Sequence, residues 1–192
     1  MKKMVRVIIT VCLFMISMTT SQAREIAGVT LAEQIVREAD NVELRLNGAG
    51  IRKKLFFKVY LASLYLPQPT SDIAEVTAAD RPARVQMHIL YSEIEKEKFV
   101  KGWNDGFSAN LDAARLETVR ERLDQFNAMF ETLKAGDLIN LDYSPGEGTR
   151  VTIKEVDKGV IPGGDFYQAL LMVWLGDSPI SQSLKQQLLG AD

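Results

Sequence analysis

Alternating apolar and polar positions predict strands over much of the N-terminal half of the chain. Residues 42–46, 51–66 and 83–91 alternate with period two and are rich in β-branched and aromatic side chains. The Asn-Gly-Ala-Gly run at 47–50 is predicted to be the turn between the first two strands, because glycine tolerates positive φ. From position 55 to 61 the odd positions are apolar and the even ones mixed, which predicts one core face and one mixed face.

From Ser92 onward the apolar period becomes helical. Ser92 and Glu95 have the spacing of a capping box, and apolar residues at 94, 99, 103, 107 and 111 extend the predicted helix to about Ala114. A second helix is predicted over residues 116–133, with Gly136 as its C-terminal stop.

The C-terminal part returns to strands and then to helices. Residues 137–142 and 150–156 flank a Ser-Pro-Gly-Glu-Gly turn and predict a hairpin, and a second turn at 157–159 leads to a short strand at 160–161. Two short helices are expected at 165–175 and 181–189. This order predicts an α+β fold, with a mainly antiparallel sheet and a layer of helices on one face.

The first 23 residues have the pattern of a secretory signal peptide. A basic start precedes an apolar run at 7–18, and the small residues Ser21 and Ala23 predict cleavage after Ala23. The apolar run is shorter than the roughly 20 residues that span a bilayer, so we expect no stable membrane anchor. Because Cys12 lies in this segment, residues 24–192 form one predicted domain without a thiol, and we expect a periplasmic location.

Charge narrows the classes of partner. Residues 1–23 contain three basic residues and no acidic one, so 20 of 23 basic residues remain against 25 acidic ones, a net charge of −5. This balance argues against nucleic acid or an anionic membrane as a partner.

Motifs for metal or cofactor chemistry are missing from the sequence. His88 is the single histidine, and without a cysteine in residues 24–192 the usual zinc ligand set cannot be assembled. No Gly-x-Ser-x-Gly run is present, and the glycine pairs at 146–148 and 163–164 lack the spacing of a phosphate loop. We therefore expect no metal and no cofactor.

An aromatic stripe runs along the first predicted helix. Phe99, Trp103 and Phe107 recur every four residues on one face, which fits either packing against the sheet or the wall of a ligand cleft. Gly102 and Gly106 each cost this helix about 1 kcal/mol relative to alanine. Their presence predicts that the backbone closely approaches the sheet or a ligand.

Arg52 is a cation at the start of the predicted strand at 51–66. It shares the mixed face with Tyr60, but eight residues at about 3.3 Å each would place their Cα atoms roughly 26 Å apart. For both to contact one ligand, the chain must bend or turn between them, most plausibly near Lys53-Lys54.

Three stretches resemble the chalcone isomerase superfamily. GAGIR followed by LFFKVYLASLYL is similar to that family's turn and strand, KFVKGWNDGFSANLDA to its first long helix, and FYQALLMVWLGDSPISQSLKQQLLG to its closing helices. The likeness covers nearly all of residues 28–190 and is greatest for the secreted bacterial branch. It implies an open-faced sandwich, with helices on one face of a large antiparallel sheet and a cleft between the two layers.

The resemblance implies two uses for Arg52. In the true isomerases an arginine stabilises the negative charge that develops as a phenolate closes a flavanone ring. The helping threonine, tyrosine, asparagine and late Ser/Thr fall here on Tyr60, Phe99, Gly106 and Val173. Three of these four cannot donate a side-chain hydrogen bond, so little of that mechanism is expected to remain. In the fatty-acid-binding relatives, the arginine and a tyrosine at the place of Tyr60 hold a carboxylate.

The leading hypothesis is a non-catalytic periplasmic binding or carrier protein for an apolar carboxylate such as a fatty acid. Arg52 and Tyr60 would clamp the carboxylate, and the apolar cleft would be formed by Phe99, Trp103, Gly106 and Val173. One alternative is an isomerase, an intramolecular lyase of chalcone isomerase type, with Arg52 as its catalytic electrophile. Another is a protein-interaction module with a collapsed cleft, in which Arg52 is satisfied by backbone carbonyls or by Asp105.

Overall fold

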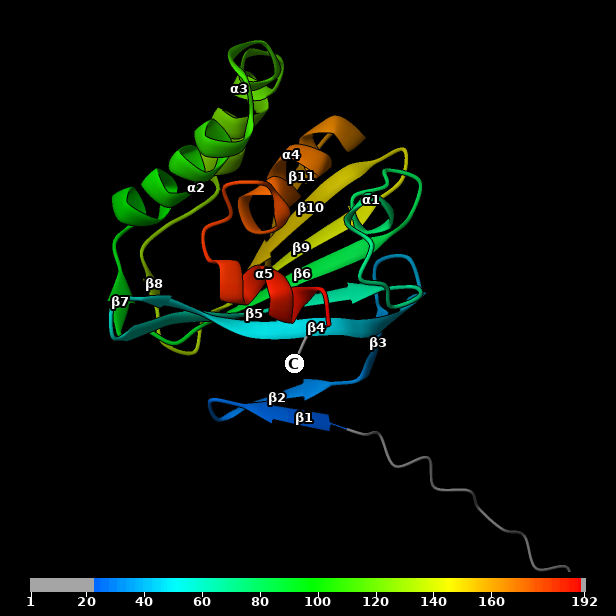
Figure 1. Ribbon diagram of the computed structural model, residues 1–192, viewed down its shortest axis with the longest axis vertical. Helices are drawn as coiled ribbons and strands as arrows, with labels where there is room; N and C mark the ends of the chain where they lie inside the picture. The colour runs from blue at the N-terminus through cyan, green and yellow to red at the C-terminus, as the bar shows by residue number, and fades with distance from the viewer. Residues whose placement is uncertain (1–22, 191–192) are drawn as a thin grey trace, which may run out of the picture.

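The computed structural model describes residues 23–190. The predicted signal peptide at residues 1–23 therefore lies, apart from Ala23, outside the described residues. Seven antiparallel strands form the main sheet, in the order β11-β10-β9-β6-β5-β4-β3 (Figure 1). These strands are β3 (Gln34–Arg37), β4 (Val42–Lys54), β5 (Phe57–Leu66), β6 (Ala83–Ile89), β9 (Leu138–Ser144), β10 (Gly148–Ile153) and β11 (Val156–Ile161).

The helices gather on one face of this sheet, as the α+β prediction requires (Figure 1). They are α1 (Ile73–Val76), α2 (Lys96–Asn110), α3 (Ala113–Ala128), α4 (Gly164–Leu175) and α5 (Gln182–Leu188). Eight of the twelve residues of α4 are buried, because this helix packs against α2, α3 and the sheet. The main hydrophobic core lies between the helix layer and the sheet.

The opposite face of the sheet is covered at β4 and β5 by a small hairpin that the apolar pattern did not predict. Strands β1 (Ala23–Ile26) and β2 (Val29–Ala32) form it, and Figure 1 shows the hairpin below the sheet, away from the helices. A second apolar cluster lies between the hairpin and the sheet and is formed by Leu31, Leu44, Leu46, Ala49, Leu61 and Tyr65. The prediction of one core face and one mixed face is therefore wrong for β5, whose central residues are buried on both sides.

The predicted turn at residues 47–50 is also wrong, because these residues lie inside β4. A Cβ atom on Gly48 would lie 2.1 Å from the carbonyl oxygen of Gln187 in α5. The amide of Asn47 donates to the Leu188 carbonyl at 2.7 Å and accepts from the Thr70 amide at 2.6 Å. Glycine is needed here for the close approach of α5, and no reversal of the chain occurs.

The start of α2 and the end of α3 differ from the predicted helix ends, because strand pairing between distant residues overrides the local helix signals. Helix α2 begins at Lys96 and not after Ser92, since β7 (Glu93–Ile94) pairs with β8 (Leu133–Lys134). Helix α3 ends at Ala128, which leaves Leu133 free to enter β8, where it is fully buried. Two-stranded pairing of β7 with β8 thus ties the start of α2 to the segment after α3.

The turn predicted at 157–159 lies instead at residues 154–155. Lys154 and Glu155 both have positive φ, 53° and 65°, and form the two-residue connection between β10 and β11. A connection with positive φ at both positions matches the right-handed twist of the flanking strands. Gly159 sits at a bulge, where the register of β10 and β11 shifts.

Candidate ligand-binding site

Arg52 and Tyr60 face each other across a hairpin. Strands β4 and β5 are joined at Leu55-Phe56, and Arg52 is the register partner of Tyr60. Directly opposed residues of antiparallel strands have Cα atoms about 4.5–5.5 Å apart. The turn expected near Lys53-Lys54 is therefore present at Leu55-Phe56. The separation of roughly 26 Å between the Cα atoms of Arg52 and Tyr60, which assumed one regular strand, does not apply.

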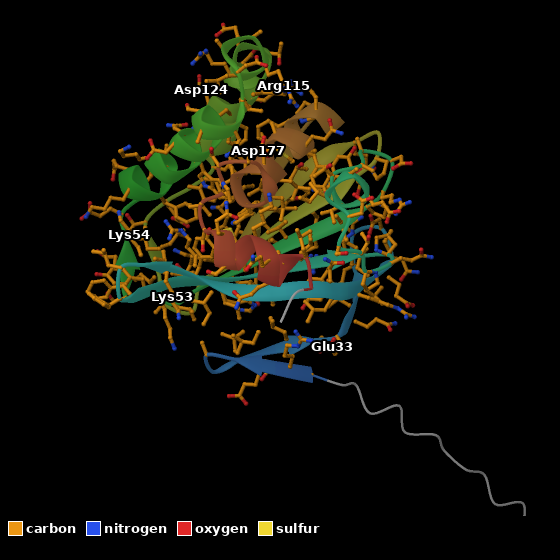
Figure 2. All side chains as sticks on the ribbon, in the orientation of Figure 1. Glu33, Lys53, Lys54, Arg115, Asp124 and Asp177 are labelled. Atoms are coloured by element: carbon orange, nitrogen blue, oxygen red, sulfur yellow. The ribbon has the colours of Figure 1, made fainter. Side chains whose placement is uncertain are left out.

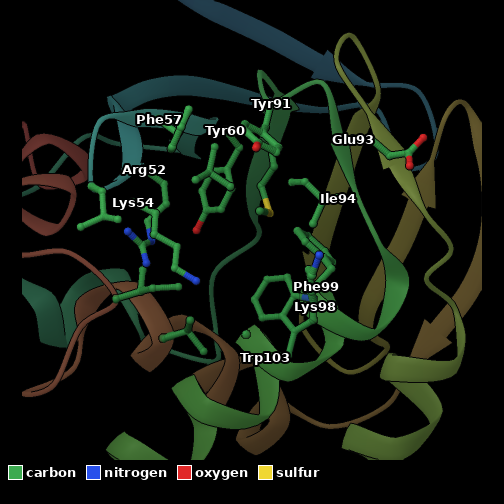
Figure 3. Close-up of a pocket in the computed structure, with 16 residues that line it drawn as sticks. Arg52, Lys54, Phe57, Tyr60, Tyr91, Glu93, Ile94, Lys98, Phe99 and Trp103 are labelled. Carbon is green, nitrogen blue, oxygen red and sulfur yellow. The ribbon is translucent and has the colours of Figure 1, made fainter.

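A cavity of about 440 Å³ opens beside this pair, between the sheet and the helix layer (Figure 3). This volume falls within the range of small-molecule pockets, roughly 300–1,000 Å³. The collapsed cleft of the third hypothesis is thus contradicted. The apolar lining residues are Leu55, Phe57, Val59, Met87, Tyr91, Ile94, Phe99, Gly102, Trp103, Val173 and Ile180. The polar ones are Arg52, Lys54, Tyr60, Glu93 and Lys98.

The hydroxyl of Tyr60 is a buried donor held in place by Trp174. The indole Nε1 of Trp174 donates to this hydroxyl at 3.0 Å, and both side chains are buried. Burial raises the pKa of the Tyr60 phenol to about 12, although the Trp174 hydrogen bond and the charge of Arg52 act in the opposite direction. At neutral pH the phenol is therefore protonated. Its own hydrogen has no acceptor within residues 23–190 and remains available to a ligand.

Two cations beside Tyr60 lack an anionic partner in the part of the chain that the structure describes. Arg52 donates to the backbone carbonyl of Lys53, and neither Arg52 nor Lys54 has a carboxylate oxygen within 4.0 Å. Asp105, the acidic partner that the third hypothesis named for Arg52, pairs with Lys101 at 2.7 Å. Figure 3 shows the Tyr60 hydroxyl, Arg52 and Lys54 directed toward a common space.

The remaining charges of the cavity are balanced elsewhere. Glu93 lies 3.6 Å from the ammonium of Lys134, and its carboxylate turns away from the other lining residues in Figure 3. Lys98 lies 3.1 Å from Glu95. The uncompensated charge of the cavity is therefore positive and concentrated at Arg52 and Lys54.

The aromatic stripe of α2 forms part of the cavity wall. Phe99 and Trp103 line it and contact each other edge to face, with ring centroids 5.6 Å apart. Trp103 also packs at 5.3 Å against Trp174, the partner of Tyr60. Phe107, by contrast, is fully buried and packs against Phe166, with ring centroids 5.7 Å apart. Core packing thus applies to Phe107, and the wall of a ligand cleft to Phe99 and Trp103.

The two glycines of α2 have different surroundings. A Cβ atom on Gly106 would lie 2.8 Å from Val173 Cγ1, so this glycine allows α2 and α4 to approach closely. A Cβ atom on Gly102 would meet nothing within 4 Å, and this glycine lines the cavity. Of the six residues expected at the ligand site, five line one cavity, and Gly106 instead packs behind Val173.

Several lining residues escaped the sequence analysis. Lys54 could have been found, because it lies two positions after Arg52 and so on the same face of the strand. Tyr91 and Ile180 come from segments far from β4 in sequence, and no local pattern connects them with it. The helix propensity of Gly102 predicts a close approach at this position, but it does not indicate whether a ligand or the sheet lies next to the glycine.

Residues 23–190 contain no group of three or more His, Cys, Asp and Glu side chains placed to hold a metal ion. None of the described helices is long and apolar enough to cross a membrane. His88 is half-buried with its Nε2 3.0 Å from Gln86 Oε1, and burial lowers its pKa. His88 is therefore a strand residue with a hydrogen-bond partner, as expected for a lone histidine in a predicted strand.

Known proteins share this architecture. A solved structure of a fatty-acid binding protein from Arabidopsis thaliana superimposes with a TM-score of 0.62 at 16% sequence identity, over 82% of this chain and 96% of that one. At this identity the match establishes a common fold. The comparison with curated protein sequences returned no match. The model of the chalcone isomerase-like family matches residues 23–190, nearly the whole chain. The chain therefore belongs to the chalcone isomerase-like family.

Proposed function

We propose that the protein binds an apolar ligand with a carboxylate, such as a fatty acid, and carries it without chemical change. One observation carries the proposal: the Tyr60 hydroxyl converges on a mostly apolar cavity with Arg52 and Lys54, two cations that have no carboxylate partner among residues 23–190. The solved relative of the same fold is a fatty-acid binding protein, which supports this choice of ligand class.

The chemistry of these three groups suits a carboxylate. A guanidinium presents a planar fork that binds a carboxylate through two charge-assisted hydrogen bonds, and a lysine adds a point charge. The Tyr60 hydroxyl already accepts a hydrogen bond from Trp174, so the role left to it is donation. An anion would therefore meet donors and positive charge, while a hydrocarbon tail would contact Met87, Phe99 and Val173.

The surroundings of Arg52 favour binding over the isomerase alternative. At the positions where the resemblance implies helping polar groups, Phe99 and Val173 present hydrocarbon to the cavity, and Gly106 lies behind Val173. Removing a single oriented donor commonly costs an enzyme 10²–10³ in rate. Loss of chalcone absorbance no faster than the spontaneous ring closure is the expected result, and clear acceleration would favour the isomerase.

The proposed location is the periplasm, as in the secreted bacterial branch of the family, after removal of residues 1–23. The basic and apolar pattern of that segment supports export. Intact-mass measurement of the protein recovered from a periplasmic fraction should give a chain that begins at Arg24. A full-length mass in the cytoplasmic fraction would contradict this part of the proposal without touching the ligand site.

The ligand test compares oleate with its methyl ester in displacement of a fluorescent fatty acid. The two probes share one hydrocarbon tail, but the ester carries no charge, so we expect it to bind at least about tenfold more weakly. Arg52→Ala should weaken oleate binding by a similar factor and reduce the difference between acid and ester. Mass spectrometry of gently purified protein should also detect a co-purified lipid.

Two further variants locate the binding site. Arg120→Ala removes an exposed arginine of α3 that pairs with Glu117, so it serves as a matched control with unchanged oleate binding. Gly102→Leu places a side chain in the open space beside Gly102 and should block the tail while leaving the fold intact. Equal affinity for oleate and its ester, or equal loss in Arg120→Ala and Arg52→Ala, would refute the carboxylate clamp.

A further inference from the structure

The tip of the β4–β5 hairpin exposes apolar side chains that the fold does not use. Leu55 is 84% exposed, Phe56 97% and Phe57 56%. Among residues 23–190, six large apolar side chains lie exposed, and four of them gather here, since Tyr91 contacts Phe57 with ring centroids 5.6 Å apart. Contiguous exposed apolar surface of this kind marks a site of contact with a protein or a membrane.

The backbone of the tip also has an unusual conformation at Leu55. Leu55 has a φ of 55°, in the left-handed region where hairpins ordinarily carry glycine or asparagine. A branched apolar residue is thus held in a disfavoured conformation with its side chain in water. Neither the main core nor the smaller cluster gains from this arrangement, because Leu55, Phe56 and Phe57 belong to neither.

Unpaired lysines surround the apolar tip. Lys53, Lys54 and Lys58 are exposed, and within the described residues none has a carboxylate oxygen within 4.0 Å. Figure 2 shows Lys53 and Lys54 at the end of the molecule formed by this hairpin. The negative net charge of the whole chain therefore does not represent this end, where the local charge is positive.

We propose that the β4–β5 tip docks on an anionic phospholipid bilayer, with Leu55, Phe56 and Phe57 entering the interface and the lysines contacting headgroups. Aromatic side chains favour the membrane interface, and each lysine near an anionic surface strengthens attachment about fivefold. A second copy of the chain fits less well, because a two-fold contact through the tip would bring the lysines of both copies together.

Docking at this end would place the mouth of the cavity at the bilayer. Leu55, Phe57 and Tyr91 belong both to the exposed tip and to the cavity lining. An apolar carboxylate could then pass between bilayer and cavity without crossing open water. This use of the tip rests on the proposed function, whereas docking itself depends on the exposed side chains and lysines alone.

The test is flotation with vesicles of phosphatidylcholine containing 30% phosphatidylglycerol, compared with phosphatidylcholine alone. All variants are prepared in the same form as the unsubstituted chain, so any contribution of residues 1–22 is common to them. The chain should float with the anionic vesicles and should lose attachment as salt rises. Phe56→Ala should weaken attachment at least about tenfold. Lys53→Gln with Lys58→Gln should weaken it roughly 25-fold.

Controls separate docking from folding and from ligand binding. Val156→Ala removes an apolar side chain that is 54% exposed, close to the 56% of Phe57, beside another turn, and should leave flotation unchanged. Phe56 does not line the cavity, so Phe56→Ala should keep its oleate affinity even if docking is lost. No attachment to anionic vesicles, or equal attachment of Phe56→Ala, would overturn the proposal. Self-association in sedimentation velocity that Phe56→Ala abolishes would overturn it in favour of a second copy.

Discussion

Replacing Tyr60 by phenylalanine removes the acceptor that Trp174 uses. The indole Nε1 lies 3.0 Å from the phenol oxygen, and the two residues are 5% and 1% exposed. A buried donor left without its acceptor costs about 1–3 kcal/mol, while the ring itself continues to fill its place. In a chain of this size each kcal/mol shifts the melting temperature by about 2–4 °C, so a fall of roughly 2–12 °C is expected.

Urea unfolding of delipidated protein measures this effect. The midpoint should fall while the m-value stays constant, because the buried surface does not change. A double-mutant cycle with Trp174→Phe isolates the hydrogen bond, since removing both partners abolishes the unsatisfied donor. The coupling free energy between the two substitutions should be about 0.5–3 kcal/mol.

A second tyrosine provides the matched control for this cycle. Tyr65 donates to the Ala32 carbonyl at 3.1 Å in the smaller cluster on the opposite face of the sheet. It shares no partner with Trp174, so the costs of Tyr65→Phe and Trp174→Phe should add. Additive costs of Tyr60→Phe and Trp174→Phe would mean that Trp174 does not fix the Tyr60 hydroxyl. The inference that this hydroxyl accepts from Trp174 and directs its own hydrogen toward the cavity would then be refuted.

Two further predictions concern helix packing and acid stability. Gly106→Ala should destabilise the fold by about 1–3 kcal/mol through overpacking against Val173, whereas Gly102→Ala should stabilise α2 by up to about 1 kcal/mol, as urea midpoints would show. Arg122 holds the pKa of Asp165 below its ordinary 3.8, so the stability from this pair is present above that pH and is lost as pH falls through the lowered pKa. Between pH 5 and 2, Asp165→Asn should therefore lose less stability than the unsubstituted chain. The difference should be no more than about 1 kcal/mol, because the Asp165 side chain is 59% exposed.

The apolar periodicity determined which segments become strands and which become helices. It placed β6, α2 and α4 within a few residues, but it merged the end of β4 with β5 in one predicted strand at 51–66. The order of the elements indicated an antiparallel sheet with helices on one face. These segments are long and strongly periodic, so burial of one face decides their structure with little help from distant residues. The short hairpin of β1 and β2 escaped prediction because four-residue strands carry too little pattern.

Candidate site residues were recognised for a different reason. Arg52 is recognised because it directly follows the Gly-Ala-Gly run and begins a strand rich in apolar residues, and Phe99 and Trp103 because they share a helical face. Resemblance to the family pairs Arg52 with Tyr60 without any knowledge of the geometry. Where each side chain would point could not be derived, since Gly102 and Gly106 have the same residue type and helix but opposite roles.

Tertiary structure alone decided where β4 turns into β5 and what the glycines of β4 and α2 do. By local rules the Asn-Gly-Ala-Gly run suits a turn. It lies within β4 because α5 packs on it, with Leu188 of that helix 141 positions beyond Asn47. The turn falls instead at Leu55-Phe56, which brings Arg52 opposite Tyr60 and leaves three apolar residues in water. Local sequence thus determined the elements of this protein. The cavity, its cations and its exposed tip depend on contacts between distant segments, whose packing no short pattern encodes.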